Sequence, residues 1–163
     1  MWYTICINCI AFNHYFFMEF FQDYLIFLIP IVVGIIAQII KFALYTLKHG
    51  WDPEYIFTHG HMPSSHTALV VSMLTSVGYY ENIHSGVFAL AAVLAFIVID
   101  DAVRIRMHLG DQGRYLNMLI EQLPISKEQY PRLKEHIGHR ANEVVVGAAI
   151  GFFLTLFFIR LFA

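Results

Sequence analysis

Charged side chains are scarce in this chain of 163 residues: only 13% are Asp, Glu, Lys or Arg, with 12 acidic and 10 basic residues. Ten basic residues among twelve acidic ones do not form the basic face that binds nucleic acid. We therefore expect no nucleic-acid partner. The length suggests a single domain spanning 1–163. Because 58% of the residues are hydrophobic and the mean hydropathy is +0.61, the composition indicates an integral membrane protein.

Cysteine is also rare. Cys6 and Cys9 form a single C-x-x-C in an apolar, aromatic segment, without a second pair that would complete a metal site. Reversible acylation, or two incidental membrane cysteines, explains them better than a redox role. The same segment lacks a basic region and a small-residue cleavage site, so we expect it to remain in the mature protein rather than act as a signal peptide.

Long apolar runs dominate the rest of the sequence. Tyr24 to Leu47 reads YLIFLIPIVVGIIAQIIKFALYTL, which is enough for one crossing at about 20 residues. Gly147 and Gly151 in the last run have the spacing of a helix-packing face. The fold class predicted is all-α, a polytopic membrane helical bundle with about four transmembrane helices, at residues 24–48, 64–80, 86–106 and 141–162.

Two further segments are less apolar. Residues 1–22 are rich in aromatics but contain polar side chains, which favours an N-terminal aromatic interfacial helix, with a fifth membrane helix as the alternative. Residues 108–140 form a polar connection. Within it, helical spacing predicts a short amphipathic surface helix whose apolar face holds Leu116, Leu119, Ile120 and Leu123.

The polar residues of the membrane segments gather at one end of the predicted bundle. If the four helices alternate in direction, the end of the first, the start of the second, the end of the third and the start of the fourth meet on one face. That face holds Lys41, Lys48, Ser64, Ser65, His66, Asp101, Arg104, Arg106, His139 and Glu143. It also carries most of the loop cations, so the positive-inside rule places it in the cytoplasm.

Converging cations at membrane depth call for an anion, and phosphate is the natural candidate. A lone lysine such as Lys41 would more often extend its ammonium to the headgroups. Pro63 suits the first turn of a helix, where the amides of Ser64, Ser65 and His66 would be unpaired donors for an anion. Ser64 or Ser65 could equally serve only as a helix cap.

His139 and Glu143 are four residues apart at the start of the last helix. At this spacing the carboxylate can accept a hydrogen bond from one ring nitrogen, which leaves the other nitrogen able to attack an electrophile. Structural pairs with the same spacing are common on helices, so the pair gains weight only in combination with the other residues.

Together, the segments K-FALYTL-K, GHMPSSH, DDAVRIR, GDQGRYLNML and LKEHIGHRANEVVVGAAIG resemble the divergent branch of the type 2 phosphatidic acid phosphatase superfamily. The resemblance covers about Gln38 to Gly151. It implies a metal-independent phosphatase in which one histidine attacks phosphorus, a second protonates the leaving alcohol, and Lys and Arg hold the phosphoryl oxygens.

Carried over by position, the resemblance assigns His139 as nucleophile, Glu143 as its orienting acid and His66 as general acid. Lys41, Lys48, Ser64, Ser65 and Arg106 would bind the phosphate, with Asp101 and Arg104 in support. Lys48 stands where an arginine is usual. Leu133 stands where the family has another arginine, so Arg106 would supply that charge from a different helix.

The sequence therefore predicts hydrolysis of a lipid phosphate monoester, of the phosphatidic acid or polyprenyl phosphate class, through a phosphohistidine, without cofactor or metal. One alternative is a non-catalytic protein that binds or transports anionic lipid and retains the phosphate site. Another is a metal site made of His59, His61 and His66 with Asp100 and Asp101. Four short helices enclose little volume, and a homodimer is one way to surround a headgroup.

Overall fold

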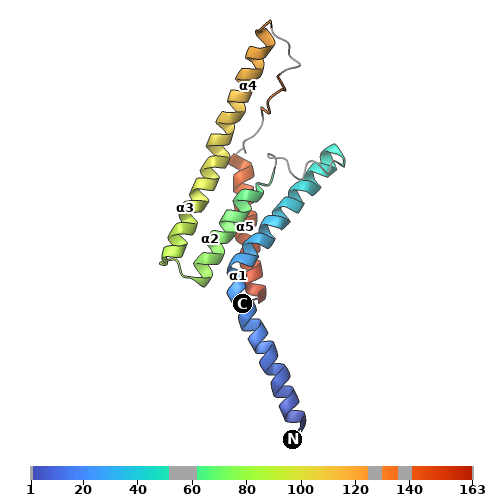
Figure 1. Ribbon diagram of the computed structural model, residues 1–163, viewed down its shortest axis with the longest axis vertical. Coiled ribbons are helices and arrows are strands. Elements are labelled where there is room, and N and C mark those ends of the chain that lie inside the picture. The colour runs from blue at the N-terminus through green and yellow to red at the C-terminus, as the bar shows by residue number, and fades with distance from the viewer. Residues whose placement is uncertain (1, 52–61, 125–129, 136–140, 163) are drawn as a thin grey trace.

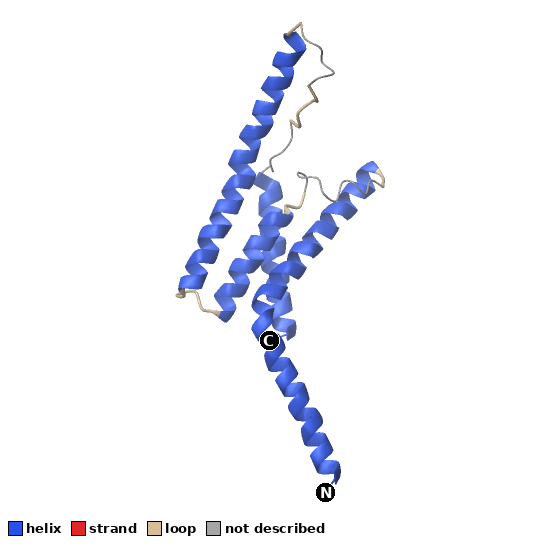
Figure 2. Cartoon of the chain, in the orientation of Figure 1, coloured by secondary structure: helices blue, strands red, loops and turns tan. Residues whose placement is uncertain are grey.

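The computed structural model describes residues 2–51, 62–124, 130–135 and 141–162, with side chains from residue 24 onward. The described residues form helices joined by loops, with no strand among them (Figure 2). The order is α1 (Trp2–His49), α2 (Ser65–Tyr80), α3 (Gly86–Asp100), η2 (Asp101–Ile105), α4 (Arg106–Gln122) and α5 (Ala141–Phe162). This confirms the all-α class predicted from the apolar runs.

Helix α1 is a single helix of 48 residues that includes Pro30. No break near residue 23 separates the predicted N-terminal helix from the first membrane segment. A proline inside a helix is tolerated in membranes because neighbouring helices can satisfy the backbone groups that it frees. The first half of α1 extends away from the other helices, whereas its second half joins the bundle (Figure 1).

Helices α3, η2 and α4 follow one another without interruption from Gly86 to Gln122. The junction is one turn of π-helix, in which the amide of Arg106 donates to the carbonyl of Asp101, five residues earlier. The predicted division into a crossing that ends at 106 and a separate surface helix is therefore replaced by one helix of 37 residues. At 1.5 Å per residue it is about 55 Å long, which exceeds the hydrocarbon thickness of a bilayer.

Three stretches of helix within the described residues are long and apolar enough to cross a membrane: Tyr24–His49, Gly86–Gln122 and Ala141–Phe162. The remaining predicted crossing, at residues 64–80, corresponds to α2, which has only 16 residues. Its length of about 24 Å falls short of the roughly 30 Å hydrocarbon core. Because its neighbours are longer, at least one end of α2 lies within the depth that they span.

The bundle core is small and lies where α1, α2 and α5 meet (Figure 1). Leu25, Ile29 and Val33 of α1 pack with Ile159 of α5 in one buried cluster. Successive helices run in opposite directions in Figure 1, as expected, so the end of α1 and the starts of α2 and α5 lie toward the same side.

Buried hydroxyl groups connect the helices inside the bundle. The Ser72 and Thr155 hydroxyls are 2.5 Å apart, linking α2 to α5, and Thr155 also donates to the carbonyl of Gly151 at 2.6 Å. Ser76 donates to the carbonyl of Ile26 in α1 at 2.9 Å. Lipid chains are as apolar as leucine, so such bonds and close packing hold membrane helices together where the hydrophobic effect does not.

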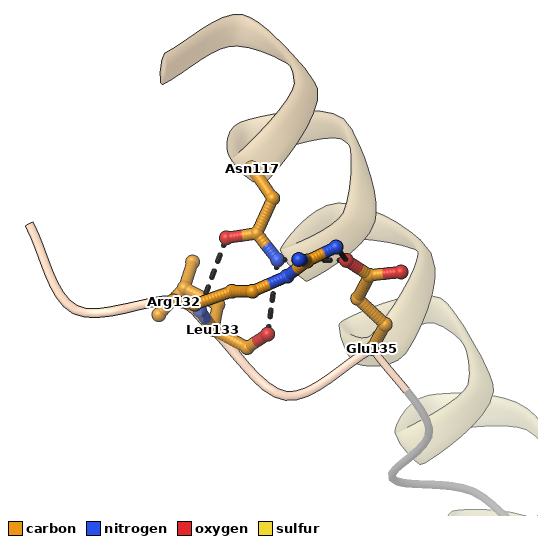
Figure 3. A network of polar contacts seen from close by, with 4 residues as sticks. All are labelled: Asn117, Arg132, Leu133 and Glu135. Atoms are coloured by element: carbon orange, nitrogen blue, oxygen red, sulfur yellow. Dashed lines mark hydrogen bonds and ion pairs between the residues drawn. The ribbon is translucent and has the colours of Figure 1, made fainter. Parts of the chain in front are cut away.

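Outside the bundle, residues 130–135 run back along α4 and are held by Asn117 (Figure 3). The Asn117 side chain donates to the Leu133 carbonyl at 2.9 Å and accepts from the Leu133 amide at 3.0 Å. It also donates to Glu135, which in turn is paired with Arg132. This pair of backbone bonds fixes the segment that leads toward the start of α5.

The face of α4 that packs against the rest of the protein consists of small and polar residues. Gly110, Gly113 and Asn117 are buried, whereas Leu116, Leu119 and Leu123 are exposed. The backbone around residue 134 packs closely on this face, because a Cβ atom on Gly113 would lie only 2.8 Å from the Lys134 carbonyl oxygen. The backbone at Lys134 can lie this close to α4 only because the facing residue is glycine.

Candidate functional site

The start of α2 is built around Ser64, which is fully buried. Ser64 is the N-cap: its hydroxyl accepts hydrogen bonds from the Thr67 amide at 3.4 Å and the Thr67 hydroxyl at 2.9 Å. Pro63 precedes the cap, outside the first turn where the sequence placed it. The sequence left open whether Ser64 caps the helix or binds an anion. The Ser64 side chain serves as the cap.

The same residue joins α2 to α5. The amide of Ser64 donates to the carbonyl of Glu143 at 3.2 Å, so this donor holds two helices together and cannot serve an anion as the sequence predicted. A Cβ atom on Gly147 would overlap the Ser64 carbonyl oxygen, which shows how closely the two backbones approach. The amides of Ser65 and His66 lie in the first turn of α2, at the positive end of the helix dipole.

Lys41 brings α1 into this group. Only 4% of its surface is exposed, and Glu143 is near enough to interact with it electrostatically. A buried ammonium without an opposite charge is expensive, and Glu143 on the first turn of α5 offsets that cost. Three helices thus place a cation, a carboxylate and a helix N-terminus together, as the alternating-helix argument predicted.

Ser65 and His66, the first two residues of α2, line one end of a groove between α1 and α2. His66 is exposed and Ser65 is half-buried. Gln38, one turn before Lys41 on α1, lines the same groove. Sequence reasoning mentioned Gln38 only as a polar residue late in the helix, and nothing in its spacing marked it as part of the site.

The two Asp–Arg pairs near η2 differ in exposure. Asp101 accepts from Arg106 Nε at 2.7 Å, with both side chains partly exposed. Asp100 pairs with Arg104 at 2.5 Å, and the Arg104 side chain is 67% exposed.

Lys48 stands apart from this group. Lys48 is exposed on the last turn of α1, and the end of α1 diverges from α2 and α5 (Figure 1). His139 lies outside the described residues, so its predicted contact with Glu143 stays a prediction. By sequence it is two positions before Ala141, the first residue of α5.

Metal ligands do not cluster in the described part of the chain, which has no group of three or more His, Cys, Asp or Glu side chains. His59 and His61 of the alternative metal site lie outside it. Asn117, which orders the approach to α5, was missed because a single asparagine on a helix carries no sequence signal of the backbone that it binds.

Taken by their chemistry, these groups can bind an oxyanion and transfer a proton. Lys41 and the first-turn amides of α2 supply positive potential, and His66 supplies a group that gains or loses a proton near neutral pH. The groove is lined mainly by apolar residues of α1 and α2. The described residues define a helical membrane protein that carries a cluster of polar and charged groups at one end of its bundle.

Comparison with known protein families identifies the family to which this membrane protein belongs. Residues 22–154 match the Divergent PAP2 family, and the chain belongs to that family. It is 33% identical over 135 residues to the uncharacterized membrane protein YuiD of Bacillus subtilis strain 168, an alignment that covers 75% of this chain and 85% of the relative. No solved structure matches the chain with statistical significance.

Proposed function

We propose that the protein is a metal-independent phosphatase that hydrolyses a lipid phosphate monoester at the end of the bundle formed by α1, α2 and α5. One observation carries the proposal: Lys41 is buried beside Glu143, whose carbonyl accepts the Ser64 amide at the start of α2. These contacts join the three segments that the family resemblance assigns to phosphate binding and catalysis. Membership in the Divergent PAP2 family supports the same chemistry.

Phosphoryl transfer requires positive charge around the equatorial oxygens and an in-line arrangement of the attacking and leaving groups. Lys41 and the amides of Ser65 and His66 would hold the oxygens, with Arg106 as a further cation. Ser64 contributes by fixing the start of α2 against α5, and Lys48, on its exposed turn, contributes less than Lys41.

Two steps complete the reaction. In the first, the neutral ring of His139 forms a bond to phosphorus while the bond from phosphorus to the lipid oxygen breaks, and protonated His66 donates its proton to that oxygen. In the second, water attacks phosphorus, the bond from phosphorus to His139 breaks, and His66 takes the proton of the water. Inorganic phosphate leaves, and both histidines return to their starting states.

Access from the membrane favours a lipid over a soluble ester. The groove beside His66 is lined mainly by apolar residues of α1 and α2. The positive-inside rule puts this end of the bundle in the cytoplasm. The substrate would then enter sideways from the cytoplasmic leaflet.

Release of inorganic phosphate from phosphatidic acid and from a polyprenyl phosphate by the purified protein in detergent tests the proposal. We expect turnover that survives chelators and falls by at least about a thousandfold in both His139→Ala and His66→Ala, because each histidine takes part in bond making or proton transfer. Glu81→Gln, on the exposed turn after α2, is the matched control and should keep full activity. No release from either lipid by folded protein would contradict the proposal.

The pH dependence provides a second test. One histidine must be neutral while the other is protonated, so the rate should rise and then fall with pH. A rate that stays constant from about pH 5 to 9 would contradict this assignment of roles.

The alternative is a protein that binds or moves anionic lipid without hydrolysing it. The exposed position of Lys48 and the presence of Leu133 where the family has an arginine favour it. Lipid binding that survives His139→Ala, together with no phosphate release by the unaltered protein, would support this alternative over the enzyme.

A further inference from the structure

An open groove of about 370 Å³ runs between α1 and α2 and ends at His66. Its walls are apolar along α1 and α2, formed by Ile31, Gly34, Ile35 and Leu69. Its polar residues, by contrast, are Gln38, Ser65 and His66, which lie at the start of α2 and one turn before Lys41 on α1. The groove is therefore apolar over most of its length and polar at one end.

The width of the groove depends on Gly34. A Cβ atom at this position would lie 2.9 Å from Leu69 Cδ1, so any larger residue would displace the leucine that forms the opposite wall. Ile31 and Gln38 are seven residues apart on α1, which is about 10 Å along the helix. The lining thus extends about 10 Å along α1, which is enough for the first part of one extended hydrocarbon chain.

We infer that this groove holds the first part of one hydrocarbon chain of the lipid phosphate, with its phosphate at the polar end. Ser65 and His66 line that end, and Lys41 lies one turn beyond Gln38 on α1. The inference rests on the proposed function and names the part of the substrate that the α1–α2 surface recognises. An occupant must carry an apolar stem and an anionic head, because the wall is apolar and the only buried cation near its polar end in the described chain is Lys41.

The groove would orient the lipid more than it would strengthen binding. A chain gains little by leaving other lipid chains for a leucine-lined wall, since both surroundings are equally apolar. Most of the affinity must then come from the phosphate, and the groove determines the position of that phosphate relative to His66. Any bilayer lipid can touch the groove, but only one with an anionic head should be retained there.

Photolabelling in nanodiscs tests this inference without relying on turnover. The probes are phosphatidic acid and a polyprenyl phosphate, each carrying a diazirine on the chain close to the head, and the matching diacylglycerol and polyprenol without phosphate. Mass spectrometry then maps the labelled residues. We expect at least one phosphate probe to label residues 31–38 and 65–69 at least about fivefold more than the matching lipid without phosphate. Comparison of the phosphatidic acid and polyprenyl phosphate probes then shows which lipid the groove holds.

Two tryptophan variants provide the matched comparison. Ile35 lines the groove and is 54% exposed, whereas Ile39, one turn away on the same helix, does not line it and is 60% exposed. Ile35→Trp should abolish the excess labelling by filling the groove, and Ile39→Trp should retain it. Circular dichroism and size-exclusion chromatography establish that both variants are folded.

Labelling of the groove that does not depend on phosphate, or that persists unchanged in Ile35→Trp, would overturn the inference. So would a benzophenone amino acid at position 35 that joins two copies of the chain, because the groove would then be covered by protein. Phosphate release is measured on the same samples. Labelling without phosphate release would support lipid binding in the groove and contradict the proposed phosphatase activity. Phosphate release without labelling of the groove would support the phosphatase activity and contradict lipid binding in the groove.

Discussion

Two close backbone contacts, α2 with α5 and α4 with residues 130–135, hold the candidate site in different ways. Both depend on glycine: Gly147 and Gly151 face the backbone of α2, and Gly113 faces the carbonyl of Lys134. The α2–α5 contact is reinforced along its length, by the Ser64–Glu143 backbone bond at one end and the Ser72–Thr155 pair further along. In contrast, the bonds that hold the backbone of Leu133 come from one side chain, Asn117.

The difference separates the part of the site proposed to bind phosphate from the segment that leads to its predicted nucleophile. Lys41, Ser65 and His66 depend on the contact inside the bundle, where several interactions would have to fail together. His139 follows the segment that Asn117 holds. Disruption of the first contact should therefore affect the whole fold, whereas disruption of the second should act locally.

The largest effect is expected for Gly147→Ala. The added methyl group would overlap the Ser64 carbonyl oxygen, and backbone atoms of two packed helices cannot easily move aside. We expect the free energy of unfolding to fall by about 3 kcal/mol, the upper end of the usual cost of overpacking, and the unfolding midpoint in detergent to fall with it. Gly86→Ala is the control, because its added methyl group would have no neighbouring atom within 4 Å, and it should unfold like the original. Equal stability of the two variants would contradict the close contact between α2 and α5.

Asn117→Leu should have an intermediate and local effect. It leaves the amide and carbonyl of Leu133 without their partner, at a cost of about 1–3 kcal/mol. We expect faster hydrogen exchange in residues 130–135 with little change in α2 and α5. Gln112→Leu, at an exposed position of the same helix, should leave exchange unaltered. Unchanged exchange in Asn117→Leu would show that the segment is held by something else.

The smallest effect is expected for Ser72→Ala. Thr155 keeps its bond to the Gly151 carbonyl, so only one interhelical contact is lost, worth about 0.6 kcal/mol on average in membrane proteins. Thr75→Ala removes a hydroxyl whose bond stays within α2 and is the matched control. A loss above about 2 kcal/mol for Ser72→Ala would mean that this pair, rather than close glycine packing, dominates the α2–α5 contact.

Sequence reasoning succeeded where one physical rule dominates. Apolar runs predicted the helical class, and alternation of direction predicted that Lys41, Ser64 and Glu143 would lie at the same end. Each of these predictions needs only the periodicity of a helix and the thickness of a bilayer.

The failures arose where local pairing or close packing overrides composition. The charged stretch from Asp100 to Arg114 looked like the end of a membrane helix, yet the helix continues because Asp100, Asp101 and Asp111 are paired with arginines along it. The glycine face of α4 was missed because leucine outweighs glycine in any hydrophobicity pattern. Whether a backbone segment packs against the glycines depends on the tertiary fold.

Vanadate binding tests most directly the claim that α1, α2 and α5 form one oxyanion site, because vanadate imitates five-coordinate phosphorus. We expect the purified protein to bind vanadate, and Lys41→Gln to weaken binding by at least about tenfold, or about 1.4 kcal/mol. Arg160→Gln, an exposed cation at the opposite end of α5, should bind like the original. Failure of folded protein to bind vanadate, or equal affinity in Lys41→Gln, would contradict the account.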